Sequence, residues 1–152
     1  MSQHRNQKRN EQTILEVIII GIFKALWFLI TLPFKGFKKG KKGLGAEEKS
    51  YITGKRLEIE KMLNSQNDIE LKHAVMEADK LVDHTFQQKG YPGATFADRL
   101  RSAQNFIDST MYNSIWQAHI VRNKLAHEQE LKITNNELRD AANKLLSYLR
   151  QI

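Results

Sequence analysis

The sequence predicts an all-α protein: an up-and-down bundle of four to five helices preceded by an N-terminal hydrophobic anchor helix. Three observations support this fold class. Apolar residues recur at helical spacing through most of residues 51–152, capping patterns precede three of these segments, and no stretch has the period of a strand. Short connections between amphipathic helices favour antiparallel neighbours, so the bundle is expected to run up and down.

Length and composition narrow the class of protein. The 152 residues suffice for one modest domain with an appendage, and the absence of cysteine excludes disulfides and thiolate metal sites. The net charge of +7 comes from the N-terminal part, because residues 1–56 contain 12 Lys and Arg against 4 Asp and Glu, whereas residues 57–152 contain 12 against 13. RNA binding would therefore depend on a local patch and not on the field of the whole domain.

Residues 1–10 form a basic tail, and residues 11–34 are predicted to be a membrane anchor. The run from Ile14 to Phe34 is apolar nearly all round, and its 21 residues could just span a bilayer. Two alternatives stay open. The helix could lie in the membrane interface with Trp27 at the level of the headgroups, or it could be a buried helix of a soluble protein.

Residues 35–50 are predicted to be a flexible linker rich in lysine and glycine. Its lysines lie next to the apolar run and are expected to contact an anionic leaflet, with a merely solubilising linker as the alternative; they are Lys35, Lys38, Lys39, Lys41 and Lys42. They outnumber the basic residues of the tail. By the positive-inside rule, the chain is expected at the cell membrane with its C-terminal domain in the cytoplasm.

The bundle itself is predicted over residues 51–152. A first helix is expected from about Lys55 to Asn64, with Leu57, Met62 and Leu63 facing inward, although Gly54 obscures its start. A second helix follows the capping pattern at Asn67 and runs over 68–88.

Three further helices complete the predicted bundle. A turn containing Gly90, Pro92 and Gly93 separates the second helix from a third, which begins after Thr95 and extends to about residue 107. The fourth helix covers residues 109–128. The fifth follows the capping box that begins at Thr134 and continues to the C-terminus.

The fourth helix carries polar residues inside its apolar arc, namely His119, Arg122, Asn123 and His127. A charge removed from water needs partners, so these groups form either a buried polar network that fixes helix register or a functional site. Asp79 and Asp83 lie four residues apart at the edge of the second helix's apolar stripe. They are candidates to pair with Arg122 or a protonated histidine, and two solvated surface carboxylates are the alternative.

Residues Arg122-Asn123-Lys124-Leu125-Ala126-His127 resemble the R-x-x-x-x-H motif of the HEPN superfamily (higher eukaryotes and prokaryotes nucleotide-binding). The resemblance implies a helical bundle and a metal-independent endoribonuclease, in which the 2′-hydroxyl of RNA attacks the adjacent phosphorus. It implies that Arg122 holds the phosphate, that His127 is the general acid or base, and that Asn123 orients the phosphate or the imidazole. His119, Asp79 and Asp83 would support this site.

The spacing of the motif constrains that interpretation. Arg122 and His127 are five positions apart, about 140° around an ideal helix, so they meet on one phosphate only at a frayed helix end or across a dimer. The resemblance implies a homodimer, and Trp116, flanked by Tyr112 and Ile120, is its expected anchor. HEPN toxins that are silenced by nucleotide transfer carry a tyrosine two residues after the histidine. Here that position is Gln129, which argues against that regulation.

The alternative function is a non-catalytic helical module that binds or scaffolds another protein at the membrane. The near-neutral charge of residues 57–152 favours this interpretation, whereas the motif favours the ribonuclease. No metal site and no cofactor are predicted. His119 and His127 are eight residues apart, and the remaining histidines suggest no ligand spacing.

Overall fold

The computed structural model describes residues 43–127 and 133–152, apart from the side chain of His127. These residues belong to one compact unit, Lys39–Ile152. The predicted tail and anchor, including Trp27, lie outside the described residues, and so do the five linker lysines that were expected to contact lipid. Within the part of the chain that is described, no helix combines the length and the apolar character needed to cross a bilayer.

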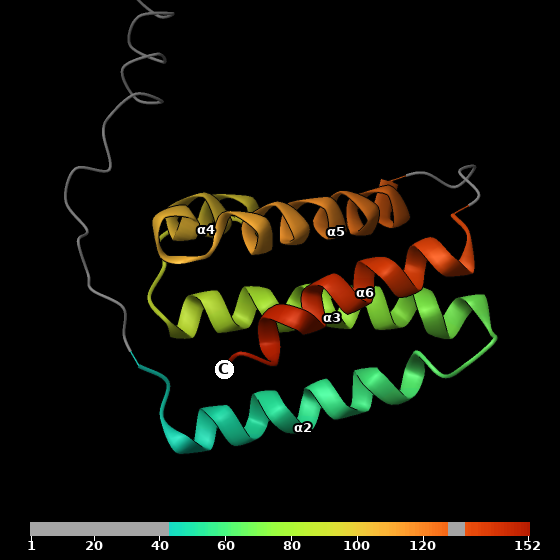
Figure 1. The fold of residues 1–152 in the computed structure, drawn as a ribbon, viewed down its shortest axis with the longest axis horizontal. Helices are drawn as coiled ribbons and strands as arrows, with labels where there is room; N and C mark the ends of the chain where they lie inside the picture. The colour runs from blue at the N-terminus through green and yellow to red at the C-terminus, as the bar shows by residue number, and fades with distance from the viewer. Residues whose placement is uncertain (1–42, 128–132) are drawn as a thin grey trace, which may run out of the picture. The chain divides into compact units, whose positions relative to one another are not determined.

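The described residues form an all-α bundle, as the sequence predicts. The elements in order are α2 (Ala46–Met62), α3 (Asp68–Gln88), α4 (Phe96–Ala103), the 3-10 turn η1 (Gln104–Phe106), α5 (Ser109–His127) and α6 (Asn135–Leu149), as Figure 1 shows. No strand occurs in residues 43–127 or 133–152. The four long helices α2, α3, α5 and α6 alternate in direction (Figure 1), and the short α4 packs against α3.

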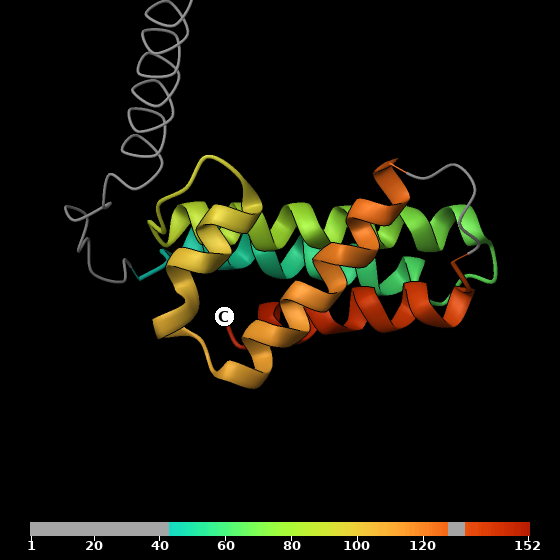
Figure 2. The same ribbon diagram turned by 90° about the horizontal axis from the view of Figure 1, so that it is seen from above.

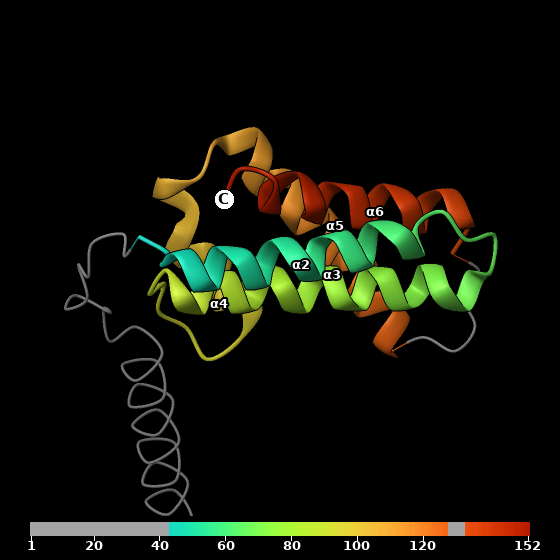
Figure 3. The same cartoon turned by 90° about the horizontal axis from the view of Figure 1, so that it is seen from below.

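Helix α3 is the central element of the bundle, because it contacts α2, α4, α5 and α6. Helix α5 crosses obliquely over α3 and α6 on one side (Figure 2), and α2 covers them on the other (Figure 3). The buried residues of α3 are Leu71, Ala74, Val75, Ala78, Asp79, Leu81, Val82, Thr85 and Phe86. Asp79 is the only charged residue in this set, so its burial needs a specific partner.

Side chains cap three of these helices where the sequence predicts them to begin. Thr95 and Asp98 form a reciprocal capping box at α4, and Thr134 and Glu137 form one at α6. Hydrogen bonds from the two threonines hold the pKa of Asp98 and of Glu137 below the ordinary value. At α3, the side chain of Asn67 accepts a hydrogen bond from the backbone N–H of residue 69. No reciprocal bond is formed, so this helix has a single cap and not the predicted capping box.

The start of the first helix was predicted incorrectly. Helix α2 begins at Ala46 instead of near residue 55, so the predicted linker over 35–50 overlaps its first turn and the boundary at residue 51 falls inside it. Its buried residues are Ile52 and Ile59, two helical turns apart, whereas Leu57 is 48% exposed and does not face inward. With only two buried apolar residues in 17, the helical period of apolar residues is weak in this segment, which is why the start of the helix was missed.

Helices α4 and α5 also depart from the prediction in detail. Helix α4 ends at Ala103 and continues as the turn η1, where a single helix to residue 107 was expected. On α5, Ile120, which flanks the expected dimer anchor, is 51% exposed. The buried residues Ile115, Ala118 and His119 define the inner side of this helix, and Ile120 follows His119 by 100° around the axis, which turns it outward.

Arg139 of α6 and Arg150, which directly follows the helix, connect α6 to the last part of α2 and the turn after it. Arg139 donates to the carbonyl oxygens of Leu63 and Ser65 at 3.3 and 2.6 Å. Arg150 pairs with Glu60 at 2.9 Å. Helix α6 lies between α5 and α2, and Figure 1 shows its C-terminal end on the side of the bundle where α2 begins.

Replacing Gly54 by alanine is expected to stabilise the bundle. Gly54 lies in the middle of α2, and a Cβ atom there would meet no other atom within 4 Å. Gly54→Ala should therefore raise the free energy of unfolding by about 0.5–1 kcal/mol, because alanine has less backbone freedom to lose on folding. Denaturant titration followed by circular dichroism measures this change.

The matched control is Gly93→Ala. Gly93 has a φ of +156°, and a Cβ atom there would lie 2.5 Å from the backbone nitrogen of Arg99. This variant should be destabilised by more than Gly54→Ala is stabilised. A neutral or destabilising effect of Gly54→Ala would contradict a regular, solvent-facing helix at that position.

Candidate functional site

A buried carboxylate joins α3 to α5. Asp79 is 4% exposed, and its Oδ1 lies 2.8 Å from Nδ1 of His119. Its Oδ2 lies 3.5 Å from Nε of Arg122. His119 and Arg122 are three residues apart, so both reach α3 from one side of α5. Asp79 was a candidate to pair with Arg122 or a protonated histidine, and it lies against both Arg122 and His119.

His119 is held on several sides. The residue is 7% exposed, and its ring stacks on Phe96 of α4 with the centroids 4.1 Å apart and an angle of 14° between the planes. The ring of Trp116 meets it edge-on at 6.2 Å. Because an ionised carboxylate can only accept, Nδ1 of His119 donates the hydrogen bond to Asp79. The imidazole therefore acts as a fixed link between α3, α4 and α5.

Arg122 is held much less firmly. Its side chain is 31% exposed, and Nε is buried near Asp79 without forming a hydrogen bond to any described atom. Nη1 donates to Oδ1 of the adjacent, partly buried Asn123 at 3.3 Å. The guanidinium group is therefore oriented by Asp79 but keeps donors that no described carboxylate or carbonyl oxygen engages closely.

Asp83 does not belong to this group, which corrects one of the predictions. It pairs with Arg99 of α4, whose Nε and Nη2 donate to its two oxygens at 2.7 and 2.8 Å. Nη1 of Arg99 donates to the carbonyl oxygen of Gly93 at 2.6 Å. Asp83 lies one helical turn beyond Asp79 and meets the first turn of α4, so it cannot serve Arg122 or His119.

His127 is the last residue of α5, and its side chain lies outside the described residues. The approach of His127 to Arg122 therefore stays a prediction, and so does the homodimer. Of the expected dimer residues, Tyr112 and Trp116 are partly buried against the core, whereas Ile120 is exposed. Within the described residues, no three metal-binding side chains come together.

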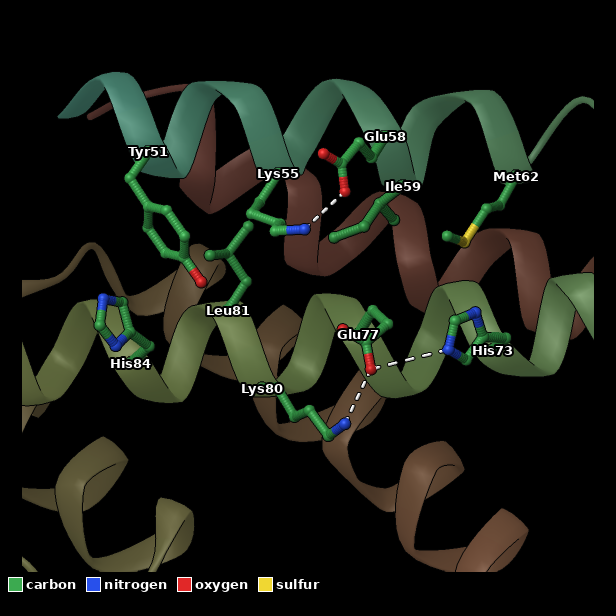
Figure 4. A pocket seen from close by; sticks show the side chains of 10 residues that line it. All are labelled: Tyr51, Lys55, Glu58, Ile59, Met62, His73, Glu77, Lys80, Leu81 and His84. Atoms are coloured by element: carbon green, nitrogen blue, oxygen red, sulfur yellow. Dashed lines mark hydrogen bonds and ion pairs between the residues drawn. The ribbon is translucent and has the colours of Figure 1, made fainter. Parts of the chain in front are cut away.

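A recess that the sequence did not indicate lies between α2 and α3. It has a volume of about 370 Å³, and Figure 4 shows the side chains of the two helices facing each other across it. None of the predicted site residues lines it. Its charged groups pair among themselves, since Lys55 meets Glu58 at 2.7 Å and Lys80 meets Glu77 at 2.8 Å. The hydrogen bond to Glu58 raises the pKa of Lys55.

The recess offers no chemistry that sequence reasoning could have recognised. Its ion pairs have the i,i+3 spacing of ordinary solvated pairs on a helix surface, which contribute little to stability. Its two histidines, His73 and His84, contact glutamates at 3.7 and 2.6 Å. We therefore take the group around Asp79 and Arg122 as the candidate site.

We compared the chain with models of known protein families, with curated proteins and with solved structures, and found no significant match in any of the three comparisons. Membership of the HEPN superfamily accordingly stays a prediction that rests on residues 122–127.

Removing the carboxylate of Asp79 is expected to destabilise the fold. Asp79→Ala leaves His119 buried without its partner, and should lower the free energy of unfolding by about 1–3 kcal/mol or more. The matched control is Asp140→Ala, since Asp140 is 63% exposed and pairs with Lys144 on the same helix. That change should cost less than about 1 kcal/mol. Denaturant titration compares the two, and equal effects would contradict a structural role for the buried pair.

Proposed function

We propose that this chain is a membrane-tethered, HEPN-like, metal-independent endoribonuclease with Arg122, Asn123 and His127 as its site. The contrast between two arginines carries the proposal. Arg99 is 11% exposed and donates three hydrogen bonds of 2.6 to 2.8 Å, so its side chain has a complete structural role. Arg122 is 31% exposed and is only loosely engaged. An arginine whose guanidinium group is oriented, but whose N–H donors are not all in hydrogen bonds, can bind an anion.

The chemistry follows from these positions. The guanidinium group of Arg122 would bind the oxygens of a backbone phosphate and stabilise the negative charge that develops on them. The 2′-hydroxyl oxygen attacks phosphorus while the bond from phosphorus to the 5′-oxygen breaks, which leaves a 2′,3′-cyclic phosphate and a 5′-hydroxyl. His127 would take the proton of the 2′-hydroxyl or protonate the leaving oxygen. Asp79 and His119 would support this site by orienting Arg122.

The proposal includes a homodimer. Residues 122 and 127 diverge by about 140° around α5, so two copies related by a two-fold axis would bring Arg122 of one protomer to His127 of the other. The outer side of α5 leaves apolar surface for such a contact, because Ile120 is 51% exposed. A second copy that packs on this surface would also exclude water from the phosphate.

A second candidate is a non-catalytic module that binds a protein partner at the membrane. The charge balance favours it, because residues 57–152 contain 12 basic and 13 acidic residues and so provide no broad attraction for RNA. Both candidates share the tether. Residues 11–34 would hold the domain at the cytoplasmic face, with Trp27 and the linker lysines in contact with an anionic leaflet.

Arg122→Lys is expected to remove activity while leaving the fold intact. Lysine keeps the positive charge beside Asp79 but loses the forked donors that grip a phosphate. Cleavage of single-stranded RNA should fall by about 100-fold or more. The melting temperature should change little, because Asp79 retains its bond to His119. His127→Ala should abolish cleavage as well. Activity should survive EDTA, and the products should end in 2′,3′-cyclic phosphates.

Arg99→Lys is the matched control for this experiment. It removes the paired bonds to Asp83, so it should lower the melting temperature more than Arg122→Lys and affect cleavage less. A folded wild-type protein that leaves varied RNAs intact would favour the binding module. A strictly monomeric protein in sedimentation would contradict both the dimer and the ribonuclease.

The full chain is expected to fractionate with membranes. The apolar run from Ile14 to Phe34 should keep the chain on the membrane through a high-salt wash, because salt weakens only the attraction of the lysines. Deleting residues 1–42 should release a folded domain, since this deletion keeps Leu44, which packs against the core, and the N-cap Gly45. Full-length protein that stays in solution without detergent or lipid would contradict the tether.

A further inference from the structure

An aromatic side chain and a loosely held cation meet beside the proposed ribonuclease site. Trp116 of α5 is partly buried, and the guanidinium carbon of Arg101 on α4 lies 5.4 Å from its ring centroid. Tyr112 and His119 also contact Trp116, but at angles of 79° and 69° between the ring planes. Neither of these two rings stacks flat on the indole, so the group that lies over its π-face is the guanidinium of Arg101.

Arg101 is free to adjust its position. Its side chain is 62% exposed, and among the described residues it donates one hydrogen bond, to Oδ1 of Asp98 at 3.2 Å. The other oxygen of Asp98 is committed to Thr95, whose hydroxyl donates to it at 2.8 Å within the capping box. An exposed pair of this kind contributes little to stability, so Arg101 can exchange it for a ligand at small cost.

Trp116 lies close enough to Arg122 for both to contact one short piece of RNA. Trp116 contacts His119, and His119 shares Asp79 with Arg122. Trp116 and Asn123 are seven residues apart, so they lie on one side of α5 about 10 Å from each other along the axis. Nη1 of Arg122 points to Asn123. A dinucleotide is long enough to bridge a phosphate at Arg122 and a base at Trp116.

We infer that Trp116 and Arg101 form a base-binding subsite for a nucleotide next to the phosphate held by Arg122. The base stacks on the indole, and the guanidinium group of Arg101 covers its other face, as aromatic and arginine side chains do with splayed bases. The bases of a duplex are already stacked on each other, so the subsite selects unpaired RNA. This inference rests on the proposed function, and it adds to that site the two residues that hold an unpaired base beside the phosphate.

The experiment uses the intrinsic fluorescence of the subsite. The sequence contains two tryptophans, Trp27 and Trp116, so Trp27→Phe leaves Trp116 as the sole reporter. The full chain in detergent micelles is titrated with a 2′-O-methyl oligoribonucleotide, which cannot be cleaved because its 2′-oxygens are blocked. Saturable quenching is expected with the single strand, and little or none with the same sequence as a duplex.

Variants then separate the two residues, with affinity measured by the anisotropy of a labelled oligonucleotide. Trp116→Ala should weaken binding by about 5- to 100-fold, and Trp116→Phe, which keeps a stacking ring and the packing of α5, by less. Arg101→Gln should weaken it by about 2- to 5-fold. The matched control is Lys80→Gln, because Lys80 is 64% exposed but lines the recess between α2 and α3. It should leave affinity unchanged.

The outcomes distinguish this inference from the proposed function. Quenching by the single strand without cleavage of RNA would support the subsite and overturn the ribonuclease. Cleavage that Trp116→Phe and Arg101→Gln leave unchanged, with no quenching of Trp116, would overturn the subsite and keep the ribonuclease. Equal quenching by single strand and duplex, or an absence of binding, would overturn the subsite.

Discussion

The packing of α5 on α3 depends on how the buried carboxylate of Asp79 is satisfied. A charged group inside an apolar stripe costs several kcal/mol unless it is hydrogen-bonded and paired. His119 meets this requirement in one relative position of the two helices, since a shift of α5 by one residue would rotate the imidazole by about 100°. The same shift would turn the buried Ile115 and Ala118 away from the core, so the apolar contacts favour the same position. The polar pair and the apolar contacts together fix the register at which α5 crosses the bundle.

That register places two chemically identical side chains in different surroundings. Arg99 donates hydrogen bonds to both carboxylate oxygens of Asp83 and to the carbonyl oxygen of Gly93. Residue 93 has a positive φ, and a Cβ atom there would meet the backbone of Arg99. Arg122 lies 3.5 Å from Asp79 through Nε and donates one hydrogen bond of 3.3 Å to Asn123 among the described residues. A composition count treats the two arginines alike. Only the positions of α4 and α5 relative to α3 separate a structural cation from one that keeps donors for a ligand.

Helix positions could be predicted from the sequence where residues close together in the chain determine the structure. The caps of α4 and α6 form at Thr95 and Thr134 because the partners of each box lie within four residues. The start of α2 was missed because its N-cap, Gly45, makes no side-chain hydrogen bond and Gly54 weakens the helical pattern. Local signals were enough for most helix positions but not for every helix boundary.

The candidate site was predictable only in part, because long-range contacts decide its partners. Helical periodicity placed Asp79 and Asp83 at the edge of one stripe, and the spacing of four residues could not tell which neighbouring helix each would meet. The short α4 reaches Asp83, and α5 reaches Asp79. The stacking of His119 on Phe96 and the approach of Arg101 to Trp116 join residues from separate helices, so no motif within one helix could indicate them.

The common location of the two ends of the described domain has a mechanical consequence. Helix α2 begins, and α6 ends, at the same end of the bundle (Figure 1). A pulling force applied between these ends acts across the contact between α2 and α6, so it would unzip the two helices successively instead of shearing them all at once. The bonds from Arg139 to the carbonyl oxygens of Leu63 and Ser65 lie at the opposite end and would be the last to bear the force. In that geometry the domain resists stretching weakly, whatever its thermodynamic stability.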